Sequence, residues 1–158
     1  MINDLQAFVA SLPTFTAVLG VLAISAIPFV ESYLGSAIGI VAGIHPLVAV
    51  PAAIVGNIIS MLVFVRVTQG ARARALRDRE TPEMSPRRTK LRNAFDRYGV
   101  AGVSLLGQTI LPSQITSAAL VSFGATPRVV VLWQVVSIIL WGVAFGLLAT
   151  LGVDVLTT

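Results

Sequence analysis

Residues 66–97, RVTQGARARALRDRETPEMSPRRTKLRNAFDR, hold ten of the eleven Lys and Arg residues of this 158-residue chain, and the exception is Arg128. The sequence on both sides is apolar. Only 11% of the chain is charged and 56% is hydrophobic, whereas about a quarter of the residues in a soluble domain are charged. Basic segments beside apolar spans are retained in the cytoplasm. The sequence therefore predicts a small multi-pass protein of the cell (inner) membrane whose basic loop is cytoplasmic.

Composition also excludes several classes of function. A sequence pI near 10.7 suggests nucleic acid, but the basic residues flank apolar spans and favour anionic lipid headgroups instead, at about 1 kcal/mol per residue near the surface. We expect no nucleic-acid partner. With no cysteine and one histidine, His45, we expect no disulfide, metal site or cofactor. Residues 1–6 lack the Lys or Arg of a signal peptide, so we expect the first apolar run to remain in the mature protein.

Four apolar stretches are visible, and they are of two kinds. The second and fourth are long enough to cross a membrane, because about 20 helical residues span ~30 Å. The first is too long for one crossing and too short for two, and Pro28 divides it into arms of about 15 residues, ~23 Å each. Pro112 divides the third, so both proline-centred stretches are predicted to be re-entrant hairpins. The stretches are residues 12–44, 47–65, 98–124 and 129–151.

The two halves of the chain share an order of landmarks. Ile27-Pro28 is followed by an apolar arm and then by Gly43-Ile44-His45-Pro46, while Leu111-Pro112 is followed by an arm and then by Gly124-Ala125-Thr126-Pro127. In each GxxP, glycine ends one helix and proline begins the next. The pattern predicts an all-α fold with an internal repeat, each repeat being a re-entrant hairpin followed by a transmembrane helix. The expected organisation is one membrane domain, 1–158, with a first half at 5–66, a basic cytoplasmic segment at 67–97 and a second half at 98–158.

The distribution of charge decides between two topologies. If both proline-centred stretches are hairpins, Arg128 joins the other ten basic residues inside and both termini lie outside. Four simple spans would instead put Arg128 outside. The positive-inside rule therefore favours the hairpins. Two halves of opposite orientation, with broken helices near the midplane, are a recurring plan of secondary transporters.

Glu31 is the most informative single residue. It is the only acidic residue between Asp4 and Asp78, and it follows Pro28 by three positions at the expected hairpin tip. Ionisable groups at such depth cost several kcal/mol and usually mark proton or substrate pathways. The alternative is that the tip reaches an interface, where Glu31 is simply hydrated.

Polar but uncharged side chains surround Pro112, and Asn57 interrupts the second span. These groups either face a hydrated cavity or a polar headgroup, or they satisfy backbone groups freed by the proline and bond across helices. No histidine or acidic residue lies near the serines and threonines, so we expect no nucleophilic catalysis and no enzyme activity. The candidate substrate-binding or proton-coupling residues are Glu31, Asn57, Gln108, Thr109, Gln114 and Thr116.

Small residues recur at four-residue spacing on two segments. Gly35, Gly39 and Gly43 form one stripe, and Gly142 and Gly146 form another. Such stripes allow helices to approach closely. They predict packing, either within the fold or between the protomers of a homodimer.

Residues 87–98 are predicted to form an amphipathic helix on the cytoplasmic leaflet. Its apolar face would carry Leu91, Ala94, Phe95 and Tyr98. The alternative is a solvated charged linker, given the two prolines upstream. The candidate residues for contacting anionic lipid headgroups are Arg87, Arg88, Arg92 and Arg97.

Several of these segments resemble the small multidrug export protein family, over nearly the whole chain. They are IPFVES at residues 27–32, Gly56-Asn57, FDRYG at residues 95–99 and LPS at residues 111–113. That family is distantly similar to the DedA, or VTT-domain, membrane proteins. The resemblance implies two opposed re-entrant hairpins and movement of lipids between leaflets. DedA-like proteins place arginines around the second proline, whereas this chain has no Lys or Arg between Gly99 and Pro127, which favours a neutral or cationic substrate.

The function expected from the sequence is therefore that of a membrane transporter. It would move a lipid-like or small amphiphilic substrate across the membrane or between leaflets, with Glu31 as the proton-linked or charge-selecting group. The alternative is a non-transporting scaffold that binds anionic lipid or a protein partner through the basic loop.

Overall fold

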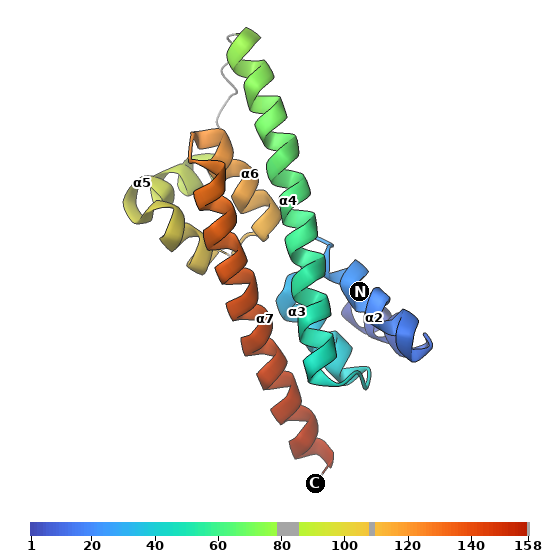
Figure 1. Ribbon diagram of the computed structural model, residues 1–158. Coiled ribbons are helices and arrows are strands. Elements are labelled where there is room, and N and C mark those ends of the chain that lie inside the picture. Colours follow the sequence, from blue (N-terminus) through green and yellow to red (C-terminus); the bar gives the residue numbers. More distant parts are fainter. Residues whose placement is uncertain (79–85, 108–109, 158) are drawn as a thin grey trace. The chain divides into compact units, whose positions relative to one another are not determined.

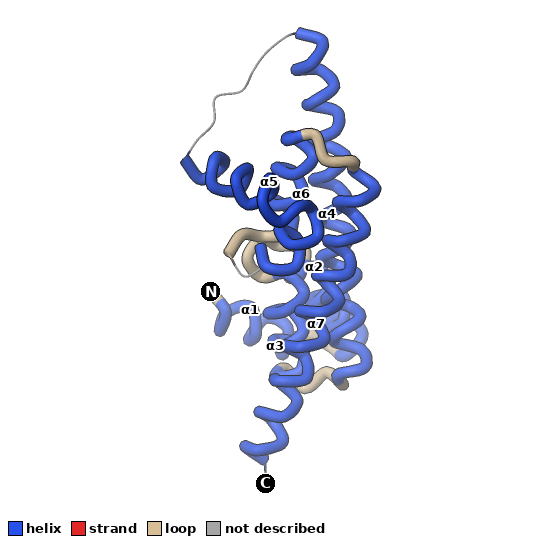
Figure 2. Tube along the Cα trace, turned by 90° about the vertical axis from the view of Figure 1, so that its left-hand side faces the viewer, coloured by secondary structure: helices blue, strands red, loops and turns tan. Residues whose placement is uncertain are grey.

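The computed structural model describes residues 1–78, 86–107 and 110–157 of the chain. All secondary structure in these residues is α-helical, so the predicted all-α class is confirmed (Figures 1 and 2). The helices are α1 (Ile2–Ala10), α2 (Thr14–Ser25), α3 (Glu31–Val41), α4 (Pro46–Asp78), α5 (Pro86–Gly107), α6 (Ser113–Phe123) and α7 (Pro127–Thr157).

The chain forms two compact units. The first contains Met1–Ser60 and Ile138–Thr158, and the second contains Met61–Ser137. The first unit therefore holds α1, α2, α3, the first half of α4 and the last part of α7. The second unit holds the rest of α4, α5, α6 and the start of α7.

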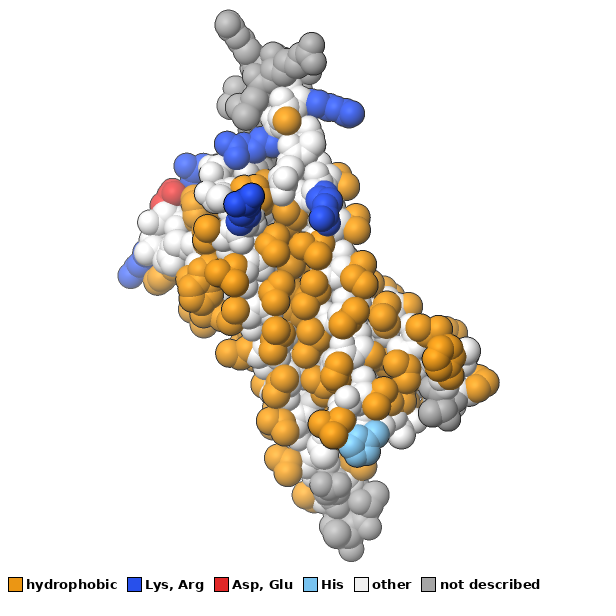
Figure 3. All heavy atoms as spheres, viewed as in Figure 1, with side chains coloured by type: hydrophobic (Ala, Val, Ile, Leu, Met, Phe, Trp, Pro, Cys, Tyr) orange, Lys and Arg blue, Asp and Glu red, His pale blue; other side chains and the backbone are white. Residues whose placement is uncertain are grey.

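Among the described residues, two helices are long and apolar enough to cross a membrane. They are Pro46–Arg74 in α4 and Pro127–Val153 in α7, with mean hydropathies of 2.3 and 2.2. Only 39% and 22% of their most apolar windows is buried inside the protein, and hydrophobic side chains are exposed along both helices (Figure 3). Large exposed apolar surfaces of this kind mark contact with a membrane or another protein. Length, composition and exposure together indicate a membrane protein.

Helix α4 extends well beyond the apolar stretch that was predicted to end at residue 65. It continues to Asp78, which places residues 66–78 of the basic segment on the same helix. Ala, Arg, Leu and Gln are strong helix formers, and they dominate this extension. Hydropathy marks where the apolar surface ends, but not where the helix ends.

The predicted GxxP punctuation is confirmed in both halves. Gly43 and Gly124 adopt left-handed φ values of 92° and 107° after α3 and α6, and α4 and α7 begin at the prolines that follow. The hydrogen bonds match as well: Ile44 N–H donates to Gly39 O at 3.0 Å, and Ala125 N–H donates to Leu120 O at 3.1 Å. This bond, across five residues, is the Schellman helix ending.

Two helix–turn–helix segments precede the long helices. In the first, α2 and α3 pack against each other through the small faces of Gly35 and Gly39, which lie against Ser25 and Val21. With 12 and 11 residues, these helices are shorter than the predicted arms, because α2 begins only after Pro13, the turn takes residues 26–30 and α3 ends before Gly43. At 1.5 Å per residue they measure about 17–18 Å. Hydropathy did not reveal α1, which precedes the first apolar stretch.

The glycine stripes pack within the first unit. A Cβ at Gly35 or Gly39 would lie 3.3 Å or 3.0 Å from an alanine Cβ of α4. On α7, Gly142 lies against Ser32 and Gly146 against α3 and α4. Gly43 is not part of the stripe: it ends a helix, and a Cβ there would meet no atom within 4 Å.

Helix α5 is divided at Gly99, whose φ of 66° and ψ of −172° are non-helical. The first part contains residues 87–98 and is helical, as predicted. Its position on the cytoplasmic leaflet, rather than in a solvated charged linker, stays a prediction. The second part forms the first arm of the second helix–turn–helix segment. The backbone conformation of Gly99 is essentially restricted to glycine.

Replacing Gly99 by alanine is expected to lower the free energy of unfolding by about 1–3 kcal/mol. A Cβ there would meet no atom within 4 Å, so the loss would come from backbone strain alone. Thermal unfolding in detergent measures it. The control is Gly70→Ala, which also meets no atom within 4 Å but lies in regular helix, where alanine stabilises by roughly 0.5–1 kcal/mol. Equal melting temperatures for the two variants would contradict the prediction.

Candidate functional site

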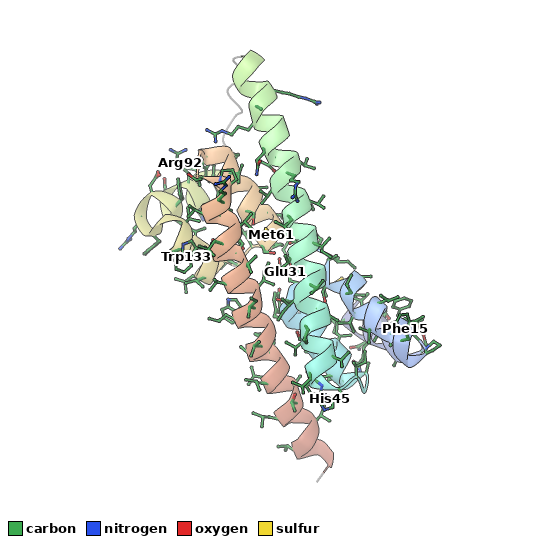
Figure 4. The ribbon with its side chains drawn as sticks, in the orientation of Figure 1. Phe15, Glu31, His45, Met61, Arg92 and Trp133 are labelled. Atoms are coloured by element: carbon green, nitrogen blue, oxygen red, sulfur yellow. The ribbon has the colours of Figure 1, made fainter. Side chains whose placement is uncertain are left out.

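Glu31 lies at the tip between α2 and α3 and is completely buried (Figure 4). The tip is closed by bonds from the N–H groups of Val30 and Glu31 to Ile27 O, at 3.1 and 3.2 Å. Phe29 and Glu31 both adopt left-handed backbone, with φ values of 73° and 52°. For residues other than glycine, this conformation costs of order 1–3 kcal/mol each and is concentrated at functional sites. The fold therefore stabilises a strained turn that presents one carboxyl group to the interior.

The helix that Glu31 begins favours its negative charge. Glu31 is in the first turn of α3, where the unsatisfied N–H groups and the helix dipole stabilise an anion. The tip is also tied to the long helices of the first unit. Ser32 Oγ donates to Ile138 O of α7 at 2.8 Å, and Ser60 Oγ of α4 donates to Ala26 O at 2.8 Å. These two bonds fix the turn that carries Glu31.

The first unit buries further polar side chains. Asn57, predicted from the sequence, is completely buried in α4. Ser36 is also completely buried, and its hydroxyl has no hydrogen-bond partner among the described residues. These polar side chains are buried beside a mainly apolar core that includes Val21, Ile24 and Ile38. The buried polar side chains of the unit are Ser25, Glu31, Ser32, Ser36 and Asn57.

The second unit buries a polar cluster at the start of α6. Pro112 is the N-cap, and Ser113, Gln114, Thr116 and Ser117 are buried directly after it. Thr116 Oγ1 donates to Leu111 O at 3.4 Å and Ser117 Oγ to Ser113 O at 2.6 Å. These two hydroxyls thus bond the backbone around the proline, as one of the two interpretations predicts. Gln108 and Thr109 lie outside the described residues.

In the described part of the second unit, three buried polar residues were missed by the sequence reasoning. Gln134 and Ser137 lie in α7 and Ser104 in α5, and all three are at most 1% exposed. Neither Nε2 nor Oε1 of Gln134 has a hydrogen-bond partner in the part of the chain that the structure describes. The signal was present, since Gln134 and Ser137 are three positions apart within an apolar run and so share one helix face.

Arg92 on α5 contacts the end of α6. Its guanidinium lies over the rings of Phe95 and Phe123, at 6.0 and 5.4 Å from their centroids, and it pairs with Asp96 at 3.3 Å. The two phenylalanine rings stack with centroids 6.3 Å apart. The amphipathic helix is therefore held to α6 through Phe95.

The structure describes the other candidate residues for lipid headgroup contact only in part. Arg97 lies over the ring of Tyr98 at 5.2 Å, and Tyr98 is 54% exposed although it was assigned to the apolar face. Arg87 and Arg88 lie on α5, but their side chains are outside the described part of the chain. Contact of these arginines with lipid remains a prediction.

Arg72 has a structural role that its position in the basic segment did not reveal. Its Nη1 donates to Val121 O, in the last turn of α6, at 3.1 Å. Its guanidinium also packs against Gly124, where an added Cβ would lie 3.3 Å from Nη2. A cation at a helix C-terminus satisfies an otherwise unbonded carbonyl and complements the dipole.

Comparisons with known proteins add no assignment. The chain matches no protein-family model, no curated protein and no solved structure.

Proposed function

We propose that the protein is an integral membrane transporter that moves a lipid-like or small amphiphilic substrate across the membrane or between leaflets. The observation that carries this proposal is Glu31: a completely buried carboxyl group at a strained helix–helix turn. Intramembrane acidic residues cost free energy and mark proton or substrate pathways. Its setting supports the same conclusion, because Ser32, Ser36 and Asn57 are also completely buried in the first unit, whose long helices expose apolar side chains.

Both helix–turn–helix segments are proposed to be re-entrant. The 11- and 12-residue helices α2, α3 and α6 are too short to cross a hydrocarbon core of about 30 Å. The matching Schellman endings after α3 and α6 support two related halves. With the basic segment and Arg128 on the cytoplasmic side of the inner membrane, the halves have opposite orientation, the plan in which transporter sites form near the midplane.

The proposed substrate site contains Glu31 and Asn57 of the first unit. Glu31 would couple transport to proton uptake or select charge, while the amide of Asn57 would form part of the polar wall. The absence of Lys and Arg from residues 100–126 favours a neutral or cationic amphiphile over a phosphate-bearing one. The resemblance to small multidrug exporters and to DedA-like proteins points to the same class of activity.

Reconstitution into liposomes tests this function. Two probes cover the proposed substrate class: ethidium, a cationic amphiphile, and glucosylceramide with a fluorescent acyl label, a neutral lipid without phosphate. Vesicles containing the protein and carrying a proton gradient are expected to move at least one probe at least about tenfold faster than protein-free vesicles, since transport proteins provide a polar path through an apolar barrier. Rates equal to those of protein-free vesicles for both probes would contradict transport and favour the scaffold alternative.

A further inference from the structure

The second unit contains a pocket between α4 and the start of α7. Its volume is ≈ 730 Å³, within the range of small-molecule sites. All of its lining residues belong to this unit. They are Leu62, Val65, Arg66, Gln69, Thr126, Pro127, Arg128 and Val131.

The polar part of the pocket is cationic. Arg66 from α4 and Arg128 from α7 both line it, together with the polar groups of Gln69 and Thr126. The lining includes no acidic residue, and neither arginine forms an ion pair within the described residues. The N-terminus of α7 adds a partial positive charge, because helix N-termini attract anions. This part of the pocket therefore matches an anionic group.

The remaining walls are apolar and are formed by Leu62, Val65 and Val131. Arg66 follows directly after the apolar stretch of α4, and Arg128 is the second residue of α7. Figure 3 shows basic side chains gathered where these apolar helix surfaces end. Such positions correspond to the membrane–water interface, where arginine side chains meet lipid headgroups.

We propose that this pocket binds one anionic phospholipid. The headgroup phosphate lies between Arg66 and Arg128, where the guanidinium groups donate to its oxygens. The start of an acyl chain lies along Leu62, Val65 and Val131. The lipid would hold the second half of α4 to the start of α7. This inference requires that the chain is embedded in a membrane but not that it transports, so a protein that binds lipid here without moving any substrate would leave it standing.

Native mass spectrometry of the detergent-solubilised protein, titrated with dioleoylphosphatidylglycerol, tests the site. The wild-type protein is expected to retain one tightly bound lipid, and Arg66→Gln/Arg128→Gln to bind it about 20-fold more weakly. The matched control is Arg74→Gln/Lys90→Gln, which removes the same charge from two exposed residues outside the pocket. Its affinity is expected to change by less than about twofold.

Two further titrations separate the possible sources of the anion. Dioleoylglycerol supplies the acyl chains without a phosphate, and glycerol 3-phosphate supplies the phosphate without acyl chains. Both are expected to bind at least about tenfold more weakly than phosphatidylglycerol, because each lacks one half of the match. Binding of glycerol 3-phosphate as tight as that of the lipid would overturn the lipid assignment. Equal losses in the pocket variant and in its control would overturn the site.

Discussion

Replacing Gly56 by alanine is expected to destabilise the first unit by about 3 kcal/mol or more, and Gly56→Val to prevent its folding. A Cβ at this position would collide with the carbonyl oxygen of Leu22 on α2, and it would lie 2.8 Å from the carbonyl carbon. The obstacle is backbone, so no side-chain rotamer can relieve the overlap. Helix α2 would have to move away from α4, leaving a void around the buried residues Val21 and Ile24.

The melting temperature in detergent and the fraction of monodisperse protein on size-exclusion chromatography measure this effect. Gly70→Ala is the matched control, since it makes the same change in the same helix, where a Cβ would meet no atom within 4 Å. The control is expected to melt at or above the wild-type temperature. If Gly56→Ala melted within about 2 °C of wild type, the close approach of α2 and α4 described here would be wrong.

Local chemistry explains which parts of the fold were predictable. Gly43, Pro46, Gly124 and Pro127 begin and end helices as expected, because their effects depend on the backbone of a few neighbouring residues. Mean hydropathy identified α4 and α7 for a similar reason, since it averages the hydropathy of the residues in one segment. Neither kind of prediction depends on which other segments pack against the helix.

Features that depend on packing partners were missed. The role of Arg72 requires α6 to end beside α4, and nothing in residues 66–97 specifies that neighbour. The bond from Ser32 to Ile138 O joins residues 106 positions apart, so no local pattern could reveal it. The left-handed backbone of Phe29 and Glu31 opposes their intrinsic preferences, so only the tertiary structure can impose it.

Packing also decides how the polar residues around Pro112 are used. Thr116 and Ser117 bond nearby backbone carbonyls, as the structural interpretation of these residues expects. Participation of Gln114 in a substrate site stays a prediction. Ser36 and Gln134, for which no role was predicted, are buried with polar atoms that no described residue satisfies, and burying such groups is costly.

Glu31→Gln is expected to reduce transport by at least about tenfold while leaving the melting temperature equal to or above that of wild type. The amide has nearly the shape of the carboxyl group, so the packing of the tip is retained. It cannot ionise, so the cost of burying a charge disappears together with any proton exchange. Slower transport combined with an unchanged or higher melting temperature would identify Glu31 as a functional carboxyl group. If the carboxyl group were structural, its replacement would lower stability and transport together.

Flux of the transported probe in proteoliposomes, followed as the external pH is varied, is the measurement. Residual flux in Glu31→Gln is expected to be independent of pH, whereas Glu31→Asp should retain a pH-dependent fraction because it can still exchange a proton. Ser36→Ala is the matched control: it alters another completely buried polar residue of α3, whose hydroxyl makes no bond that the substitution would break. If the flux of Glu31→Gln equalled that of the wild type, Glu31 would take no part in transport. Equal loss in Ser36→Ala would show that flux follows the packing of α3 rather than the carboxyl group, because that variant leaves the carboxyl group in place.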